Sequence, residues 1–87
     1  MTRQLVTAEV HQAVHRRDGG CVGPRIGMPG QCEWHLELDH VRASGGLSLR
    51  SRSTPDNLVV LCSLHHRMKT EAGRTWRPPL LAYLGLP

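Results

Sequence analysis

The sequence predicts a small α+β domain, in which two strands and the helix after them are flanked by an N-terminal helix and a short C-terminal helical tail. The chain has 87 residues, which suffices for one domain. Short alternating or fully apolar runs indicate the strands, and apolar residues three and four apart indicate the helices. No internal repeat or low-complexity linker divides the chain, so residues 1–87 are expected to form a single domain.

The first expected element is a helix near the N-terminus. Thr7 can cap a helix that runs to about Arg17, apolar side chains recur on one of its faces, and Gly19 follows as a stop signal. Residues 21–31 are rich in Gly and Pro and are expected to form a loop.

Two strands are expected on either side of a polar loop. Residues 33–41 alternate around Leu36 and Leu38, whose side chains are expected to face the core. Residues 58–61 are continuously apolar, as in a buried strand. Residues 42–56, which hold glycine, serine and arginine, are expected to form the loop.

The last part of the chain is expected to be helical in two pieces. One helix is expected over about 64–72, with Gly73 as its end. Pro78 and Pro79 then precede an apolar tail, and a short helix is expected over 80–84.

Composition predicts that a metal helps to hold so small a domain together. The chain has no Phe, only 3% aromatic residues, three Cys and six His. An odd number of Cys argues against a self-contained set of disulfides, and Cys and His are the usual ligands of structural zinc.

The ligands of this zinc can be assigned in two ways. Cys62 and His65 lie two residues apart between an apolar strand and a helix, as in a zinc knuckle. Cys21 and Cys32 would complete a Cys3His tetrahedron, which is the preferred assignment. Because Cys21 and Cys32 are far apart in sequence, Cys32 with His35 is a rival pair that would leave Cys21 as a free thiol. A further alternative is that the cysteines pack as small apolar residues.

The charge of the chain is compatible with a nucleic-acid partner. The formal net charge is +4, and residues 42–77 hold seven Lys and Arg against Asp56 and Glu71, a net charge of +5. Such a stretch suits a phosphate backbone, although a solvated basic face is an equal alternative. No apolar run is long enough for a signal or a membrane span, so a cytoplasmic protein without a membrane partner is expected.

Four segments together resemble the HNH endonuclease family, which is also called the ββα-metal nuclease superfamily. They are LDHV (38–41), GG (45–46), NLVVLC (57–62) and HHRMKT (65–70). They follow the family's order and spacing, and the motif core covers about 21–73. The family's second knuckle usually reads Cys-x-x-Cys-His where this chain has Cys62-x-x-His65-His66, and histidine can replace cysteine on zinc. A weaker likeness is to the small HNH proteins of actinobacteria and their phages.

The resemblance implies a role for each residue of the motif. His40 would be the general base, a task that suits a neutral imidazole near neutral pH. Asp39 and His66 would bind a catalytic divalent metal, for which Mg²⁺, Mn²⁺, Ni²⁺ and Zn²⁺ are all candidates. Asn57 would hydrogen-bond across the loop between the strands and hold His40 in place. Asp39 and His40 are strand neighbours that would normally face opposite sides, so the strand must end or twist there.

Basic side chains near this motif are candidate contacts to the DNA backbone. Lys69 lies three residues after His66, hence on the same side of the helix, although a solvated lysine is an equal alternative. The other candidates are Arg42, Arg50, Arg52, Arg67 and Arg74.

The expected function is therefore a metal-dependent DNA endonuclease, a phosphodiester hydrolase that nicks or cuts with little sequence specificity of its own. DNA is the expected partner of a monomer or weak dimer, and the phage likeness adds a terminase subunit in phage DNA packaging. One rival is a non-catalytic zinc-containing DNA-binding module. Another is a structural zinc domain that docks a protein through residues 80–86.

Two further groups of side chains are not assigned to a site. His11 and His15 lie four residues apart, but they are interpreted as surface histidines and not as metal ligands. Trp34, Trp76 and Tyr83 could stack on bases, but with so few aromatic residues the core is expected to use them.

Overall fold

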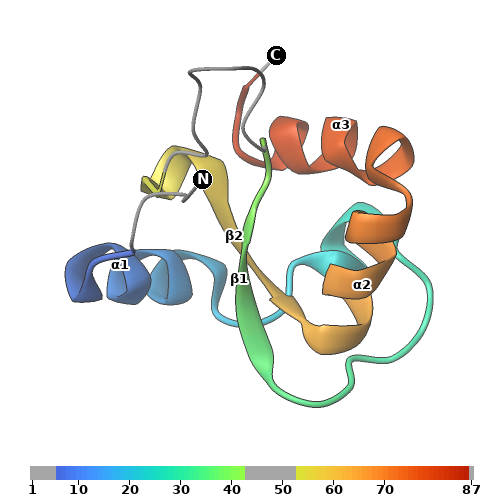
Figure 1. Cartoon of the computed structure of the whole chain (residues 1–87), viewed down its shortest axis with the longest axis horizontal. Helices are drawn as coiled ribbons and strands as arrows, with labels where there is room; N and C mark the ends of the chain where they lie inside the picture. The colour runs from blue at the N-terminus through green and yellow to red at the C-terminus, as the bar shows by residue number, and fades with distance from the viewer. Residues whose placement is uncertain (1–5, 43–52, 87) are drawn as a thin grey trace.

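The computed structural model describes residues 6–42 and 53–86, and within these residues it contains three α-helices and a two-stranded antiparallel sheet (Figure 1). The α+β class expected from the sequence is therefore confirmed. In chain order the elements are α1 (Ala8–Asp18), the 3-10 helix η1 (Gly23–Ile26), β1 (Leu36–His40), the 3-10 helix η2 (Pro55–Asn57), β2 (Leu58–Cys62), α2 (Ser63–Glu71) and α3 (Gly73–Tyr83).

Helix α1 begins and ends where its sequence signals predict. The side chain of Thr7 accepts a hydrogen bond from the Val10 N–H at 3.2 Å, which satisfies a donor of the first turn. Gly19 ends the helix in the left-handed conformation, with φ 66°, which glycine adopts without strain.

Strand β1 is shorter than predicted, and one of its leucines does not face the core. The strand covers Leu36–His40 and not residues 33–41. Leu38 packs against the buried cluster under α1, but Leu36 is 44% exposed, so the prediction for Leu36 is wrong. Leu36 pairs with Cys62 at the last position of the sheet, beyond the apolar side chains that cover Leu38.

Strand β2 is buried along its whole length and has helices on both sides (Figure 1). Leu58 and Val60 belong to a core cluster with Val14 of α1. Val59 and Leu61 belong to a second cluster, against which side chains of α2 and α3 pack. Because successive strand residues face opposite sides, this continuous apolar run fills both layers of the core.

The edge of β2 that faces away from β1 is satisfied by the chain after α1. The Val60 N–H donates to the Asp18 carboxylate at 2.9 Å, and the Val60 carbonyl accepts from the Val22 N–H at 2.8 Å. One Nη of Arg17 donates to the Leu58 carbonyl at 2.6 Å. These contacts replace a third strand and leave no open edge at these positions.

Asp18 joins α1, β2 and α3 through one buried carboxylate. It accepts from Arg17 Nε at 2.7 Å, from the Tyr83 hydroxyl at 2.6 Å and from the Val60 N–H, and it is 1% exposed. Burial raises the pKa of Asp18, but these hydrogen bonds outweigh it and the pKa is lowered overall. The ionised carboxylate is thus the form that the fold uses.

Helix α3 is longer than the predicted tail. The expectation that helical structure ends at Gly73 and resumes after the prolines is wrong, because α3 begins at Gly73 and contains Pro78 and Pro79. Ala72, with φ −134° and ψ 53°, interrupts the helical path between α2 and α3. Leu80 is fully buried, so core contacts offset the hydrogen bonds that the two prolines cannot make.

The aromatic residues are divided between core and surface. Trp76 and Tyr83 are partly buried against the core cluster beneath α3, as expected. Trp34 is 77% exposed and has a left-handed backbone with φ 67°, so the expectation that the core uses it is wrong. It lies in the connection before β1, where the backbone must turn between Cys32 and the first strand residue.

Replacing Asp18 by Asn is expected to lower the free energy of unfolding by about 2–3 kcal/mol at neutral pH, because charge-assisted hydrogen bonds are removed from a buried position. The sign follows from the lowered pKa: the stabilisation is present above the pKa of the unfolded aspartate and disappears as pH falls through the folded value. Urea denaturation measures the change. Glu9→Gln, in the exposed first turn of α1, is the matched control, and an equal loss of stability in both variants would contradict the prediction.

Candidate functional site

Four potential metal ligands meet where the chain after α1 reaches the end of β2. One donor atom from each of Cys21, Cys32, Cys62 and His65 lies within 4.8 Å of all the others. His65 Nδ1 is 3.3 Å from Cys21 Sγ, 3.2 Å from Cys62 Sγ and 3.9 Å from Cys32 Sγ. In a tetrahedral zinc site, bonds of about 2.3 Å to sulfur and 2.0 Å to nitrogen place these atoms about 3.5 Å apart. The cluster can therefore hold a metal ion such as zinc.

The His65 ring is oriented for this purpose by its surroundings. Its Nε2 lies 3.0 Å from the Pro29 carbonyl, which can only accept, so Nε2–H donates and Nδ1 is left to bind a metal. A Cβ at Gly23 would lie 2.7 Å from the ring. Only glycine therefore allows η1 to pass so close to the fully buried His65.

Backbone N–H groups surround the cysteine sulfurs. Cys21 Sγ accepts from the Cys62 N–H at 3.2 Å and from the Gly23 N–H at 3.4 Å, and Cys62 Sγ accepts from the His65 N–H at 3.4 Å. Burial raises the pKa of Cys62, but backbone hydrogen bonds from His65 and Glu33 and a side-chain hydrogen bond with Cys21 lower it overall to about 7. The thiolate of Cys62 is thus accessible near neutral pH, whereas burial and the neighbouring Cys21 and Cys62 raise the pKa of Cys32 to about 12 without a metal.

Of the two ligand assignments open from the sequence, the structure brings together the one with Cys21. The His35 side chain is 74% exposed and its Nε2 lies 2.9 Å from a Glu37 oxygen, so it points away from the cysteines. The third alternative, simple apolar packing of the cysteines, does not account for a buried imidazole nitrogen facing Cys21 and Cys62.

A second polar cluster joins β1 to α2 and contains Asp39, His66 and Lys69. His66 Nε2 lies 3.2 Å from Asp39 Oδ1, and Lys69 Nζ lies 3.3 Å from Asp39 Oδ2. Lys69 is on the same side of α2 as His66, as predicted, but it is 6% exposed, so the solvated alternative is wrong. Its Nζ also donates to the His40 carbonyl at 2.9 Å, which fixes the end of β1.

Glu37 belongs to this cluster and was not predicted. It hydrogen-bonds to His66 Nδ1, and its other oxygen accepts from Ser63 Oγ at 2.9 Å. Hydrogen bonds from His66 and Ser63 lower the pKa of Glu37. The bond to Asp39 raises the pKa of His66, burial opposes it, and the bond to Glu37 adds to the rise. The available signal was the spacing, because Glu37 and Asp39 are two residues apart and share one face of the strand.

His40 lies at the last position of β1, where the strand was required to end. Its Nε2 is 2.9 Å from the hydroxyl oxygen of Ser53, a buried residue that was also not predicted. The two strand neighbours thus have different partners. Asp39 contacts His66 and Lys69 of α2, whereas His40 contacts Ser53.

Asn57 bridges the two ends of the loop between the strands. Its Oδ1 accepts from the Arg42 N–H at 2.8 Å and its Nδ2 donates to the Arg42 carbonyl at 3.1 Å. Its backbone carbonyl accepts from the Val41 N–H at 2.9 Å. The two residues after His40 are thereby fixed.

The candidate DNA contacts are only partly placed. Arg67 lines a shallow hollow of ≈ 200 Å³ over His66, which is also lined by Glu37, Ser63 and Thr70. Arg42 follows β1 and meets Asn57 through its backbone. The glycine pair at 45–46, Arg50 and Arg52 lie outside the described residues.

Comparison with protein-family models, with curated proteins and with solved structures found no match. In the described parts of the chain, no helix combines the length and the apolar character needed to cross a membrane.

The Cys3His assignment is tested by metal content. Purified protein is expected to hold about one zinc per chain. Cys21→Ser is expected to lose most of this zinc and to melt at a lower temperature, because metal binding supplies folding energy. His35→Gln is expected to keep the zinc. Atomic emission and thermal melting with a chelator measure both effects. Zinc absent from His35→Gln and retained by Cys21→Ser would reverse the assignment.

Proposed function

We propose that the chain is a metal-dependent DNA endonuclease of the HNH type, which nicks or cuts phosphodiester bonds with low sequence specificity. β1, β2 and α2 would then be its ββα-metal unit. The observation that carries the proposal is the contact of Asp39 with His66 across β1 and α2 at 3.2 Å, because these are the two residues expected to share a catalytic metal. His40 ends β1, and Asn57 ends η2 directly before β2.

The donor atoms fit a shared divalent ion. Two ligands at right angles on an ion with bonds of about 2.1 Å lie about 3 Å apart, close to the separation of Asp39 Oδ1 and His66 Nε2. One oxygen and one nitrogen suit Mg²⁺, Mn²⁺, Ni²⁺ or Zn²⁺ and leave positions for water and phosphate oxygens. When bound, such an ion supplies stabilisation of the charge on the leaving oxygen.

The remaining steps belong to side chains of the site. His40 takes a proton from the attacking water, whose oxygen bonds to phosphorus while the bond to the leaving 3′ oxygen breaks. That oxygen takes a proton from solvent water, giving 5′-phosphate and 3′-hydroxyl ends. Ser53 orients the His40 ring through Nε2, and Asn57 fixes the backbone that follows. Lys69 balances the charge of Asp39 and holds the His40 carbonyl.

A non-catalytic zinc-containing DNA-binding module is the second candidate function. The contact of the His40 ring with Ser53 favours it. Strand neighbours face opposite sides and Asp39 faces α2, so the His40 ring is directed away from the side of β1 where a catalytic metal would bind. A terminase subunit is the proposed protein partner of either form, on the sequence likeness to phage proteins alone.

Nicking of supercoiled plasmid separates the two functions. Purified protein with Mg²⁺, Mn²⁺, Ni²⁺ or Zn²⁺ is expected to convert the plasmid to the open-circular form, and His40→Ala is expected to lose at least about 100-fold in rate, because the general base is gone. His15→Ala on α1 is the matched control and should retain the rate. DNA binding without cleavage by any of these metals would favour the binding module.

Glu37→Ala is expected to lower nicking by about 10–100-fold and to raise the metal concentration needed for half the maximal rate, because His66 loses the group that orients its ring. Glu37→Gln keeps an oxygen that can accept from His66 Nδ1 and should lose less. Glu33→Ala, an exposed glutamate of the same segment, is the control. An unchanged metal requirement in Glu37→Ala would show that Glu37 does not position His66.

A further inference from the structure

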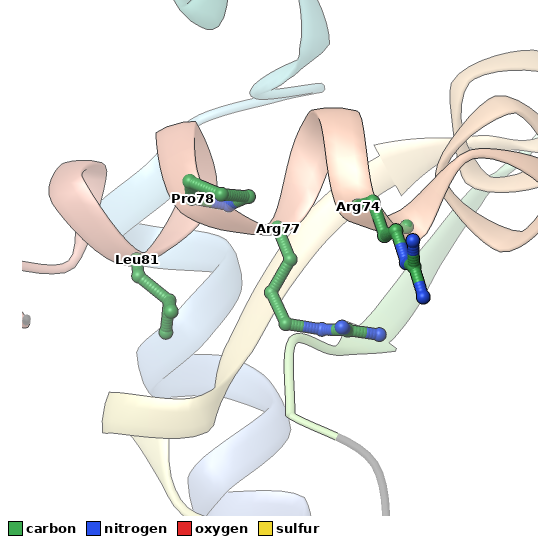
Figure 2. Close-up of a pocket in the computed structure, with 5 residues that line it drawn as sticks. Arg74, Arg77, Pro78 and Leu81 are labelled. Atoms are coloured by element: carbon green, nitrogen blue, oxygen red, sulfur yellow. The ribbon is translucent and has the colours of Figure 1, made fainter.

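A groove lies along α3 and shares no lining residue with either polar cluster described above. It has a volume of ≈ 360 Å³ and is lined by Gly73, Arg74, Arg77, Pro78 and Leu81. Figure 2 shows the two guanidinium groups on the same side of the helix, with Arg77 extending toward the end of β1. An apolar wall thus carries two positive charges at one end.

The charged end of the groove is connected to the candidate active site. Arg77 Nε donates to the Val41 carbonyl at 3.0 Å, and Lys69 Nζ donates to the carbonyl of the preceding residue, His40, at 2.9 Å. Successive Cα atoms are about 3.8 Å apart, so Arg77 and Lys69 hold adjacent peptide groups at the end of β1. The charged end of the groove therefore adjoins the backbone that carries His40.

No carboxylate in the described parts of the chain forms an ion pair with Arg74 or Arg77. Arg77 donates from Nε to the Val41 carbonyl, which leaves its Nη groups to contact a ligand. The Arg74 side chain is exposed. A Cβ at Gly73 would lie 3.1 Å from Arg77 Nη2, so the guanidinium packs closely against Gly73.

We infer that this groove binds the sugar-phosphate backbone of the DNA strand next to the scissile phosphate, with Arg74 and Arg77 on successive phosphates. A guanidinium presents paired N–H donors that match phosphate oxygens, and Pro78 and Leu81 offer an apolar surface to the sugars. Contacts to phosphates position DNA without reading its sequence. The inference rests on the proposed function for its choice of ligand.

Binding is measured by fluorescence anisotropy of a short labelled DNA duplex, in a His40→Ala background that prevents cleavage. Arg74→Gln with Arg77→Gln is expected to weaken binding at least about tenfold and to reduce the slope of log affinity against log salt by about 0.9 for each phosphate that the protein no longer neutralises. Arg74→Gln alone should reduce the slope by about 0.9, and it replaces an exposed side chain, so folding is preserved. Arg16→Gln, exposed on α1, is the charge-matched control with an unchanged slope.

The outcomes separate this inference from the proposed function. A weaker, less salt-dependent complex in the Arg74 and Arg77 variants supports the groove even if the wild-type chain cuts no plasmid. Wild-type affinity and slope in those variants, the same effect in Arg16→Gln, or no DNA binding by the parent protein would overturn it. Binding of a labelled polyglutamate peptide in place of the duplex would also overturn it, since the groove would then dock an acidic protein.

Discussion

The polar edge of β2 that faces away from β1 is the constraint on which the rest of the structure depends. β2 is buried at every position, so its N–H and C=O groups must find partners within the protein. Asp18 and Val22 satisfy Val60, and Cys21 Sγ accepts from the Cys62 N–H. The segment that closes the sheet edge is therefore the same segment that brings Cys21 to the metal cluster.

The metal cluster in turn determines how α2 presents its side chains to β1. Cys62 ends β2 and its sulfur accepts from the His65 N–H at the start of α2. Because neighbours on a helix lie about 100° apart, His65 faces the cysteines while His66 faces Asp39. Ser63, in the same turn, holds Glu37 against His66. One helix start thus serves both polar clusters, so a displacement of Cys62 or His65 would disturb both.

Local signals predicted the parts of the fold that local chemistry decides. Thr7 begins α1 and Gly19 ends it, through their own hydrogen bonds and backbone conformation. The apolar run of β2 requires burial on both faces. The exposure of Leu36 and Trp34 and the helix through Pro78 were not predictable in this way. These features depend on how far the packed helices and strands nearby extend in space, and a short stretch of sequence does not determine that.

The candidate site shows the same division. The motif placed Asp39 beside His66, whereas the roles of Glu37 and Ser53 arise from contacts between distant segments. The backbone of residues 40–42 is held from three sides, by Lys69 of α2, by Arg77 of α3 and by Asn57 at the end of η2. The proposed function needs a fixed backbone at His40, because small displacements of a general base cost much of the rate. These three supports come from three different segments and converge on the end of β1, so contacts between segments distant in the sequence set the position of His40.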